Sequence, residues 1–147
     1  YREGLPERLR IRELQNRSGP EQALTAAAAS DLNQAMRVER AAFEPEIRKL
    51  GGAVRFRVGY PEDAWLRDAE PRAQRLAFAE QQIPRAEAFY ARIRARASAF
   101  LTPAQLNRLR QMQDERLASR RAQILRATYV GAAEDALRKA EAAASAR

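Results

Sequence analysis

The five residues LTPAQ that begin at Leu101 fix where the longest helix of this chain must start. The Thr102 hydroxyl can accept a hydrogen bond from a free backbone N–H of the first helical turn. Pro103 falls at the first helical position, where no backbone N–H is needed. Gln105 can reach back to the N–H of Thr102 and close a capping box, and Leu101 and Leu106 are placed to form a hydrophobic staple. The motif therefore predicts a junction between two helices.

Both sides of this junction have helical periodicity. From Pro71 to Leu101, apolar residues alternate at spacings of three and four, which is a heptad seam. The seam consists of Leu76, Ala79, Ile83, Ala86, Tyr90, Ile93, Ala97 and Phe100. From Pro103 to about Ser145 a second pattern predicts one buried face, made of Leu106, Leu109, Met112, Leu117, Ile124, Leu125, Thr128, Tyr129, Ala132, Ala136 and Leu137. We expect the two helices to pack as a hairpin.

The remaining segments predict an all-α fold of long bent helices in one domain, residues 1–147. A helical pattern runs from about Pro20 to Leu50, and Gly51-Gly52 ends it. Prolines within the helical patterns, Pro45 and Pro84, predict bends. Residues 53–60 alternate apolar and basic side chains, which predicts one extended loop, and a short helix is expected from Pro61. We expect residues 1–17 to form a short helix or a loosely attached arm, and residues 138–147 to be a frayed tail.

The net charge is +8, and Lys49 and Lys139 are the only lysines among 27 cations. Such a surface suits anionic or amphipathic partners. Ordinary solvated helix faces are an equally simple interpretation, since charged helix faces are common. The charge alone does not choose between them.

The composition excludes several chemistries. There is no cysteine and no histidine, which excludes disulfides, Cys/His zinc sites and histidine acid/base catalysis. Acidic pairs such as Glu62-Asp63 are sequence neighbours, so they point to different sides of a helix. Gly51-Gly52 lacks the lysine-containing frame of a phosphate loop. We predict a protein that is not an enzyme and has neither a cofactor nor a metal site.

One stretch combines aromatic and basic residues. An exposed patch of this kind could hold partly unfolded or acidic peptides. The candidate residues for binding a client or partner are Arg55, Phe56, Arg57, Tyr60, Trp65 and Arg67. The alternative is that these aromatics fold back and seal one end of the helical bundle.

Residues 101–117, LTPAQLNRLRQMQDERL, resemble the LTxxQ motif of the Spy/CpxP-like periplasmic proteins of Gram-negative bacteria. The matching positions are Leu101, Thr102 and Gln105. An earlier counterpart, LTAAA from Leu24, has alanine where the family has glutamine. The resemblance implies a periplasmic helical protein that forms a homodimer through long antiparallel helices. It also implies an ATP-independent chaperone or a stress-response modulator, in which Thr102, Pro103 and Gln105 are structural.

Two other functions stay open at this point: a helical adaptor or assembly factor for one envelope protein, and a basic nucleic-acid-binding protein. The helical patterns lack helix-turn-helix or zinc-finger spacing, and the arginines are spread along every helix. No apolar run approaches the ~20 residues that span a bilayer. The chain starts at Tyr1, so a periplasmic assignment presumes that a signal peptide has been removed.

Overall fold

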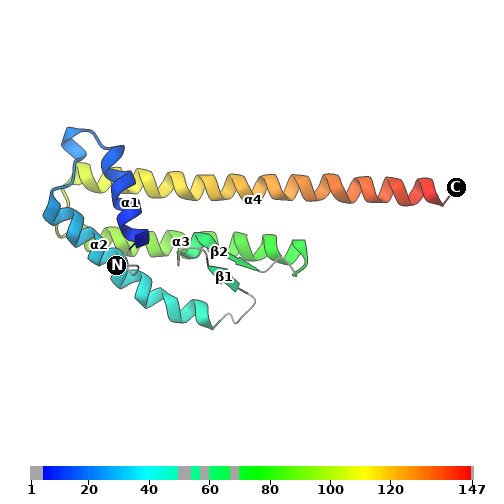
Figure 1. The fold of residues 1–147 in the computed structure, drawn as a ribbon, viewed down its shortest axis with the longest axis horizontal. Helices are drawn as coiled ribbons and strands as arrows, with labels where there is room; N and C mark the ends of the chain where they lie inside the picture. Colours follow the sequence, from blue (N-terminus) through cyan, green and yellow to red (C-terminus); the bar gives the residue numbers. More distant parts are fainter. Residues whose placement is uncertain (1–4, 50–53, 57–59, 67–69, 147) are drawn as a thin grey trace.

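The computed structural model describes residues 5–49, 54–56, 60–66 and 70–146. Its helices are α1 (Leu5–Asn16), α2 (Ala26–Arg48), α3 (Arg72–Ala97) and α4 (Pro103–Ser145). Short 3-10 turns are η1 (Pro20–Gln22) and η2 (Pro61–Asp63), and the strands are β1 (Val54–Phe56) and β2 (Ala64–Leu66). Figure 1 shows α3 and α4 running antiparallel, with α1 and α2 crossing them near one end. The predicted all-α fold and the α3–α4 hairpin are confirmed.

The capping motif has the predicted geometry. Thr102 has an extended backbone (φ −68°, ψ 160°), and its hydroxyl accepts a hydrogen bond from the Gln105 N–H at 3.2 Å. The Gln105 side-chain oxygen accepts from the Thr102 N–H at 2.9 Å. The Gln105 amide nitrogen also donates to the carbonyl of Ala23 at 2.8 Å. The junction is therefore tied to the segment before α2, where the Thr25 hydroxyl accepts from the Ala28 N–H.

Thr102→Ala is expected to lower the free energy of unfolding by about 1 kcal/mol, the usual cost of removing a helix cap. The replacement leaves the Gln105 N–H without its acceptor while Gln105 keeps its bond to Ala23. Urea denaturation followed by circular dichroism measures the loss. Ser119→Ala, on an exposed side of the same helix, is the matched control. An equal change in the two variants would contradict the role of the cap.

The heptad seam of α3 forms the centre of the core. Ala79, Ile83, Ala86, Tyr90, Ile93 and Ala97 are all buried. Leu76 and Phe100 are partly buried against the same core. Phe89 lies outside the strict seam, yet it is fully buried and contacts the rings of Phe43, Tyr60 and Tyr90. The large and small alternation of the seam lets α4 pack closely against α3.

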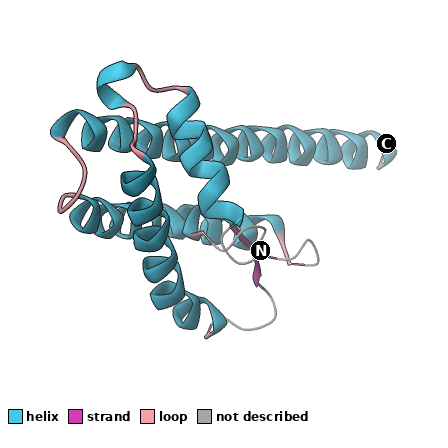
Figure 2. Ribbon diagram, turned by 60° about the vertical axis from the view of Figure 1, so that its left-hand side comes forward, coloured by secondary structure: helices cyan, strands magenta, loops and turns pink. Residues whose placement is uncertain are grey.

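The segment between α2 and α3 differs from the prediction of an extended loop followed by a helix. β1 and β2 pair as an antiparallel hairpin, with Arg55 opposite Trp65 and Phe56 opposite Ala64. The turn η2 begins at Pro61 and reverses the chain so that Ala64–Leu66 becomes the missing partner strand. A three-residue strand is too short to show alternation, and this is why the sequence pattern predicted a helix there. The ribbon views show the hairpin beside α3 (Figures 1 and 2), and β2 packs against that helix.

The first and last described helices differ in part from the sequence predictions. α1 is not a loose arm, because Glu7, Arg10, Ile11 and Leu14 are buried. α4 stays helical to Ser145 where fraying was expected from residue 138. Alanine, which dominates that end of the helix, has the highest helix propensity of all residues. α2 and α3 each continue through their internal prolines.

α2 carries a charged residue among its buried positions. Glu39 falls among the buried positions of α2 and is 5% exposed. It is paired with two arginines of α3: its carboxylate lies 3.0 Å from Arg92 and also contacts Arg96. The buried charge is therefore compensated, as the packing of a carboxylate at a helix interface requires.

Candidate functional site

The described residues among the six predicted to bind a client or partner lie in different parts of the molecule. Arg57 and Arg67 lie outside the described residues. The backbones of Arg55, Phe56 and Trp65 lie in the β-hairpin. Tyr60 is fully buried, which corrects the expectation that it belongs to an exposed patch. For Tyr60 the alternative applies, since its ring packs into the bundle against Phe89 at a centroid distance of 5.6 Å.

A second apolar surface lies on the C-terminal half of α4. Its large members are strongly exposed: Leu125 by 57%, Tyr129 by 70%, Val130 by 49% and Leu137 by 61%. The alanines at 132, 133, 136 and 140 are exposed beside them. We call this set the outer face of α4. Most of these residues were expected in the buried face of the helix, so that prediction is wrong for this half of α4.

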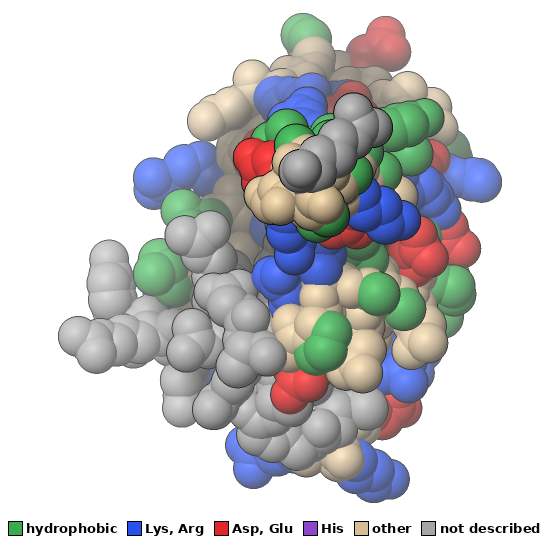
Figure 3. All heavy atoms as spheres, turned by 90° about the vertical axis from the view of Figure 1, so that its right-hand side faces the viewer, with side chains coloured by type: hydrophobic (Ala, Val, Ile, Leu, Met, Phe, Trp, Pro, Cys, Tyr) green, Lys and Arg blue, Asp and Glu red, His purple; other side chains and the backbone are tan. Residues whose placement is uncertain are grey.

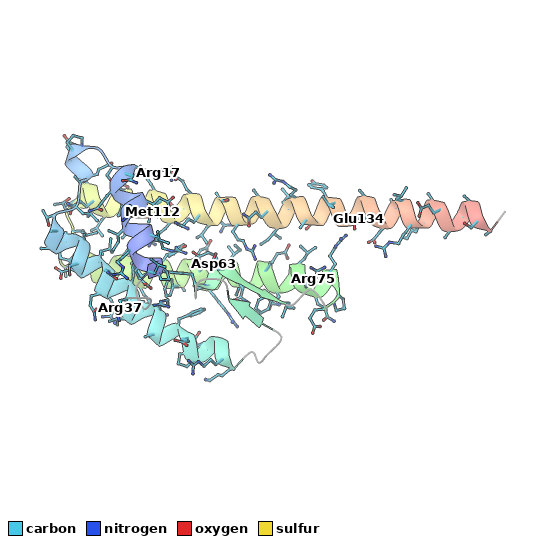
Figure 4. The ribbon with its side chains drawn as sticks, viewed as in Figure 1. Arg17, Arg37, Asp63, Arg75, Met112 and Glu134 are labelled. Atoms are coloured by element: carbon cyan, nitrogen blue, oxygen red, sulfur yellow. The ribbon has the colours of Figure 1, made fainter. Side chains whose placement is uncertain are left out.

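Two features explain this exposure: α3 covers only one side of α4, and α4 extends beyond α3. Gly131 is buried against the side chain of Arg72, the first residue of α3. Arg72 also pairs with Glu134 at 2.6 Å. Beyond Glu134 the helix continues past the end of α3, as Figure 1 and the labelled residues Arg75 and Glu134 in Figure 4 show. The second half of α4 therefore has one side against α3 and another apolar side toward solvent.

A groove between α3 and α4 adjoins the outer face. It has a volume of about 520 Å³ and an apolar floor. The lining residues are Glu80, Ile83, Pro84, Arg121, Ile124, Leu125 and Thr128. Pro84 has no N–H to donate to the carbonyl of residue 80. Leu125 belongs to both the groove and the outer face, which makes them one continuous surface.

Cationic groups border this surface. Arg121 pairs with Glu87 across the α3–α4 seam, and Arg138 lies 3.1 Å from Asp135. Arg126 and Lys139 are exposed on α4. Viewed from the C-terminal end of α4, apolar side chains lie beside arginine and lysine side chains on the near face (Figure 3). An apolar surface with a charged rim resembles the composition of protein–protein interfaces.

The other concentration of chemical groups is a buried polar cluster under α1. Arg10 donates to the Tyr90 hydroxyl at 3.0 Å and to the Glu62 carboxylate at 2.9 Å. Its guanidinium also lies 3.5 Å from the centroid of the Tyr60 ring. The Tyr60 hydroxyl donates to Glu7 at 3.3 Å, and the Tyr90 hydroxyl donates to Glu62. Four elements, α1, α2, η2 and α3, meet here, since Glu7 also pairs with Arg40 of α2 at 2.6 Å.

Burial dominates the titration of this cluster. Burial raises the pKa of Tyr60 and of Tyr90, and the carboxylate of Glu62 beside Tyr90 raises it further. Burial alone would lower the pKa of Arg10, but the neighbouring Tyr90 and Glu62 outweigh it and the pKa is raised. Burial, and then the charge of Glu62, raise the pKa of Asp63. The cluster is thus held with neutral tyrosines and a charged arginine.

The two tyrosines predict alkaline destabilisation. A phenol with a raised folded-state pKa contributes stability that is complete below its unfolded value of 10.0 and is lost as the pH rises through the folded value. The free energy of unfolding should fall above about pH 10 by roughly 1.4 kcal/mol per pH unit for each tyrosine. Urea melts between pH 8 and pH 11.5 measure this slope. Tyr60→Phe removes one titrating phenol, so it should reduce the slope by about 1.4 kcal/mol per pH unit. An unchanged slope would contradict the prediction.

The polar cluster was not predicted from the sequence. Its charged members, such as Glu7, Arg40 and Glu62, lie far apart in the sequence, and a charged residue in an otherwise polar segment gives no signal of burial.

Among the described residues, no group of three or more Asp or Glu side chains is placed to hold a metal ion. None of the described helices is both long and apolar enough to cross a membrane. Comparison with protein-family models, with curated proteins and with solved structures gives no match to this chain.

Proposed function

We propose that this protein is a non-enzymatic polypeptide-binding protein that holds apolar segments of other proteins on the outer face of α4 and in the adjoining groove. The observation that carries the proposal is the exposure of Leu125, Tyr129 and Leu137 along one helix. Burying a leucine or a side chain of similar size contributes about 1.5–3 kcal/mol. Several such side chains along one helix therefore give an unfolded segment an apolar surface to bind without any cofactor.

The class of function that we propose is an ATP-independent chaperone or an envelope-stress modulator of the periplasm. The resemblance of residues 101–117 to the LTxxQ motif supports both the class and the compartment. Arg126 and Lys139 beside the outer face suit clients that carry acidic residues between apolar ones, because opposite charges increase the rate of encounter.

An aggregation assay tests the chaperone proposal. A chemically unfolded client such as citrate synthase is diluted into buffer with increasing amounts of the full chain, and light scattering follows its aggregation. We expect suppression near stoichiometric protein, and we expect 0.5 M NaCl to weaken it only moderately, because salt screens the charges but not the apolar contacts. Aggregation that is unchanged at a fivefold excess of the protein would refute the proposal.

An adaptor or assembly factor for one envelope partner is the second candidate. The narrowness of the outer face favours it, since a single helix side suits one complementary helix better than many clients. A pull-down from an envelope extract that yields one stoichiometric protein, together with no protection of generic clients, would support this candidate. Sedimentation equilibrium of the wild-type chain tests the predicted homodimer.

Nucleic-acid binding is the least supported alternative. The net charge of +8 favours it, but many of the arginines are already paired with carboxylates within the fold. Such pairs are made by Arg10, Arg17, Arg40, Arg48, Arg72, Arg92, Arg96, Arg116, Arg121 and Arg138. Fluorescence anisotropy with labelled duplex and single-stranded DNA in 50 mM salt tests it, since phosphate contacts are strongest at low salt.

A further inference from the structure

α1 is attached to the bundle mainly through charged groups. Only Ile11 and Leu14 of this helix enter the apolar core. Its polar contacts include the ion pairs of Glu7 with Arg40, Arg10 with Glu62 and Glu13 with Arg116, and Arg17, directly after the helix, pairs with Glu115. Hydrogen bonds join Glu7 to Tyr60 and Arg10 to Tyr90. Figure 4 shows Arg17 close to Met112 where α1 crosses α4, and Asp63 near the other end of α1. The helix therefore contacts the bundle through a short apolar stripe that has charged contacts on both sides.

The surface under α1 is built by elements that hold one another in place. Arg40 comes from α2, Glu62 from η2 and Tyr60 from the position before η2. Tyr90 comes from α3 and Arg116 from α4. The rings of Phe43, Tyr60 and Tyr90 meet around Phe89, and α3 packs directly against α2, η2 and α4. A helix of twelve residues, in contrast, is marginal in water without a surface to pack on. α1 therefore needs the surface in order to stay helical, and we expect the surface, whose elements also contact one another, to persist when α1 leaves it.

The fit of α1 to this surface is incomplete. The second carboxylate oxygens of Glu7 and Glu62 are buried and accept no hydrogen bond from any described residue. Glu62 belongs to the surface, so one of its acceptors is left open when α1 is bound. A buried acceptor without a donor is unfavourable. A helix that carried one more donor near this position would fit better than α1 does.

We infer that the surface under α1 is a second docking site, which accepts an amphipathic helix of a partner protein, and that α1 occupies it in cis. The chemistry of the occupant is given by α1 itself. It carries one carboxylate toward Arg40, a guanidinium toward Glu62 and Tyr90, two neighbouring aliphatic side chains, and a second carboxylate toward Arg116. A tethered helix acts at an effective concentration on the order of millimolar, so the cis helix excludes weak competitors.

The probe for this site is a fluorescein-labelled synthetic peptide of residues 5–16. The receptor is the full chain with Ile11→Ala and Leu14→Ala, which weakens the cis helix and leaves every residue of the docking surface unchanged. We expect the peptide to bind this variant at least tenfold more tightly than it binds the wild-type chain, because the variant has lost its cis competitor. A peptide with Glu7→Arg and Glu13→Arg, which reverses the two acidic contacts, should not bind either chain.

A covalent bridge that keeps α1 on the surface provides the opposite test. The chain has no cysteine, so Arg17→Cys with Glu115→Cys can be joined by a short bis-maleimide at the place where these side chains now pair at 2.7 Å. With wild-type Ile11 and Leu14, the bridged chain should not bind the peptide. Equal binding of the peptide to the wild-type, Ala-substituted and bridged chains would overturn the inference. It would also be overturned if the Ala-substituted chain kept the helical circular dichroism of α2–α4 and yet did not bind the peptide.

Hydrogen exchange of the wild-type chain tests the same inference without any substitution. We expect the amides of α1 to exchange through an opening that leaves α3 and the first half of α4 protected. Exchange of α1 only together with α3, at the rate of global unfolding, would refute it. Substitutions on the outer face of α4 should not change peptide binding, so failure of this site and failure of the proposed function are separate results.

Discussion

Phe89→Ala is expected to lower the free energy of unfolding by about 3–5 kcal/mol, the usual cost of removing a fully buried aromatic side chain. Phe89 is 0% exposed, and its ring lies 5.7 Å from that of Phe43, 5.6 Å from that of Tyr60 and 6.0 Å from that of Tyr90. The cavity would open where α2, η2 and α3 meet. Because a domain of this size is stable by only about 5–15 kcal/mol, the loss is a large fraction of the total.

Urea denaturation and thermal melts of the full chain measure this effect, and the expected fall in melting temperature is on the order of 10 °C. Phe78→Ala is the matched control, since the same residue type on the same helix is only half-buried. It should cost clearly less. If both variants lost the same free energy, the ring cluster around Phe89 would not be the centre of the core.

Leu125→Asp combined with Tyr129→Asp is expected to remove most of the client protection that the proposed function requires. Both side chains are more than half exposed, by 57% and 70%, so the folded state itself loses little. A client segment bound there would lose two apolar contacts and meet two buried carboxylates instead. At about 1.4 kcal/mol per tenfold change, the concentration that gives half-protection should rise about 100-fold.

The matched control for this pair is Gln123→Asp with Ala127→Asp. It adds the same charges to exposed positions of the same helix that lie outside the outer face. We expect its aggregation curves to coincide with those of the wild-type chain, and urea melts should confirm that both double variants are folded. Protection that survives in the Leu125 and Tyr129 variant would place the client-binding surface elsewhere.

The parts of the fold that the sequence predicted are those set by local contacts. The cap at Thr102 and Gln105 forms within one helical turn, so its geometry is contained in four consecutive residues. The seam of α3 follows from the period of the helix, and its members are buried as expected. The β-hairpin was missed because strand β2 exists only through its pairing with β1, and pairing depends on where the chain turns.

The candidate sites were predicted less well. The helical period correctly identified Ile124 and Leu125 as apolar positions of α4, but the first is 6% exposed and the second 57%. What separates them is the position of α3, which begins at Arg72 and covers only one side of α4. In the same way, the sequence pattern assigned Tyr60 to a surface patch. Its burial depends on the contacts with Arg10 and Glu7, which are distant in the sequence.

The sequence by itself determined that the chain is helical, where its longest helix begins, and which chemistries are absent from it, because capping, periodicity and composition are properties of neighbouring residues or of residue types alone. Only the tertiary structure decided that Glu7, Arg10 and Glu62 are buried together, and that the second half of α4 keeps an apolar side in solvent. Both outcomes depend on which elements meet in space, since burial is a property of contacts between residues far apart in the chain.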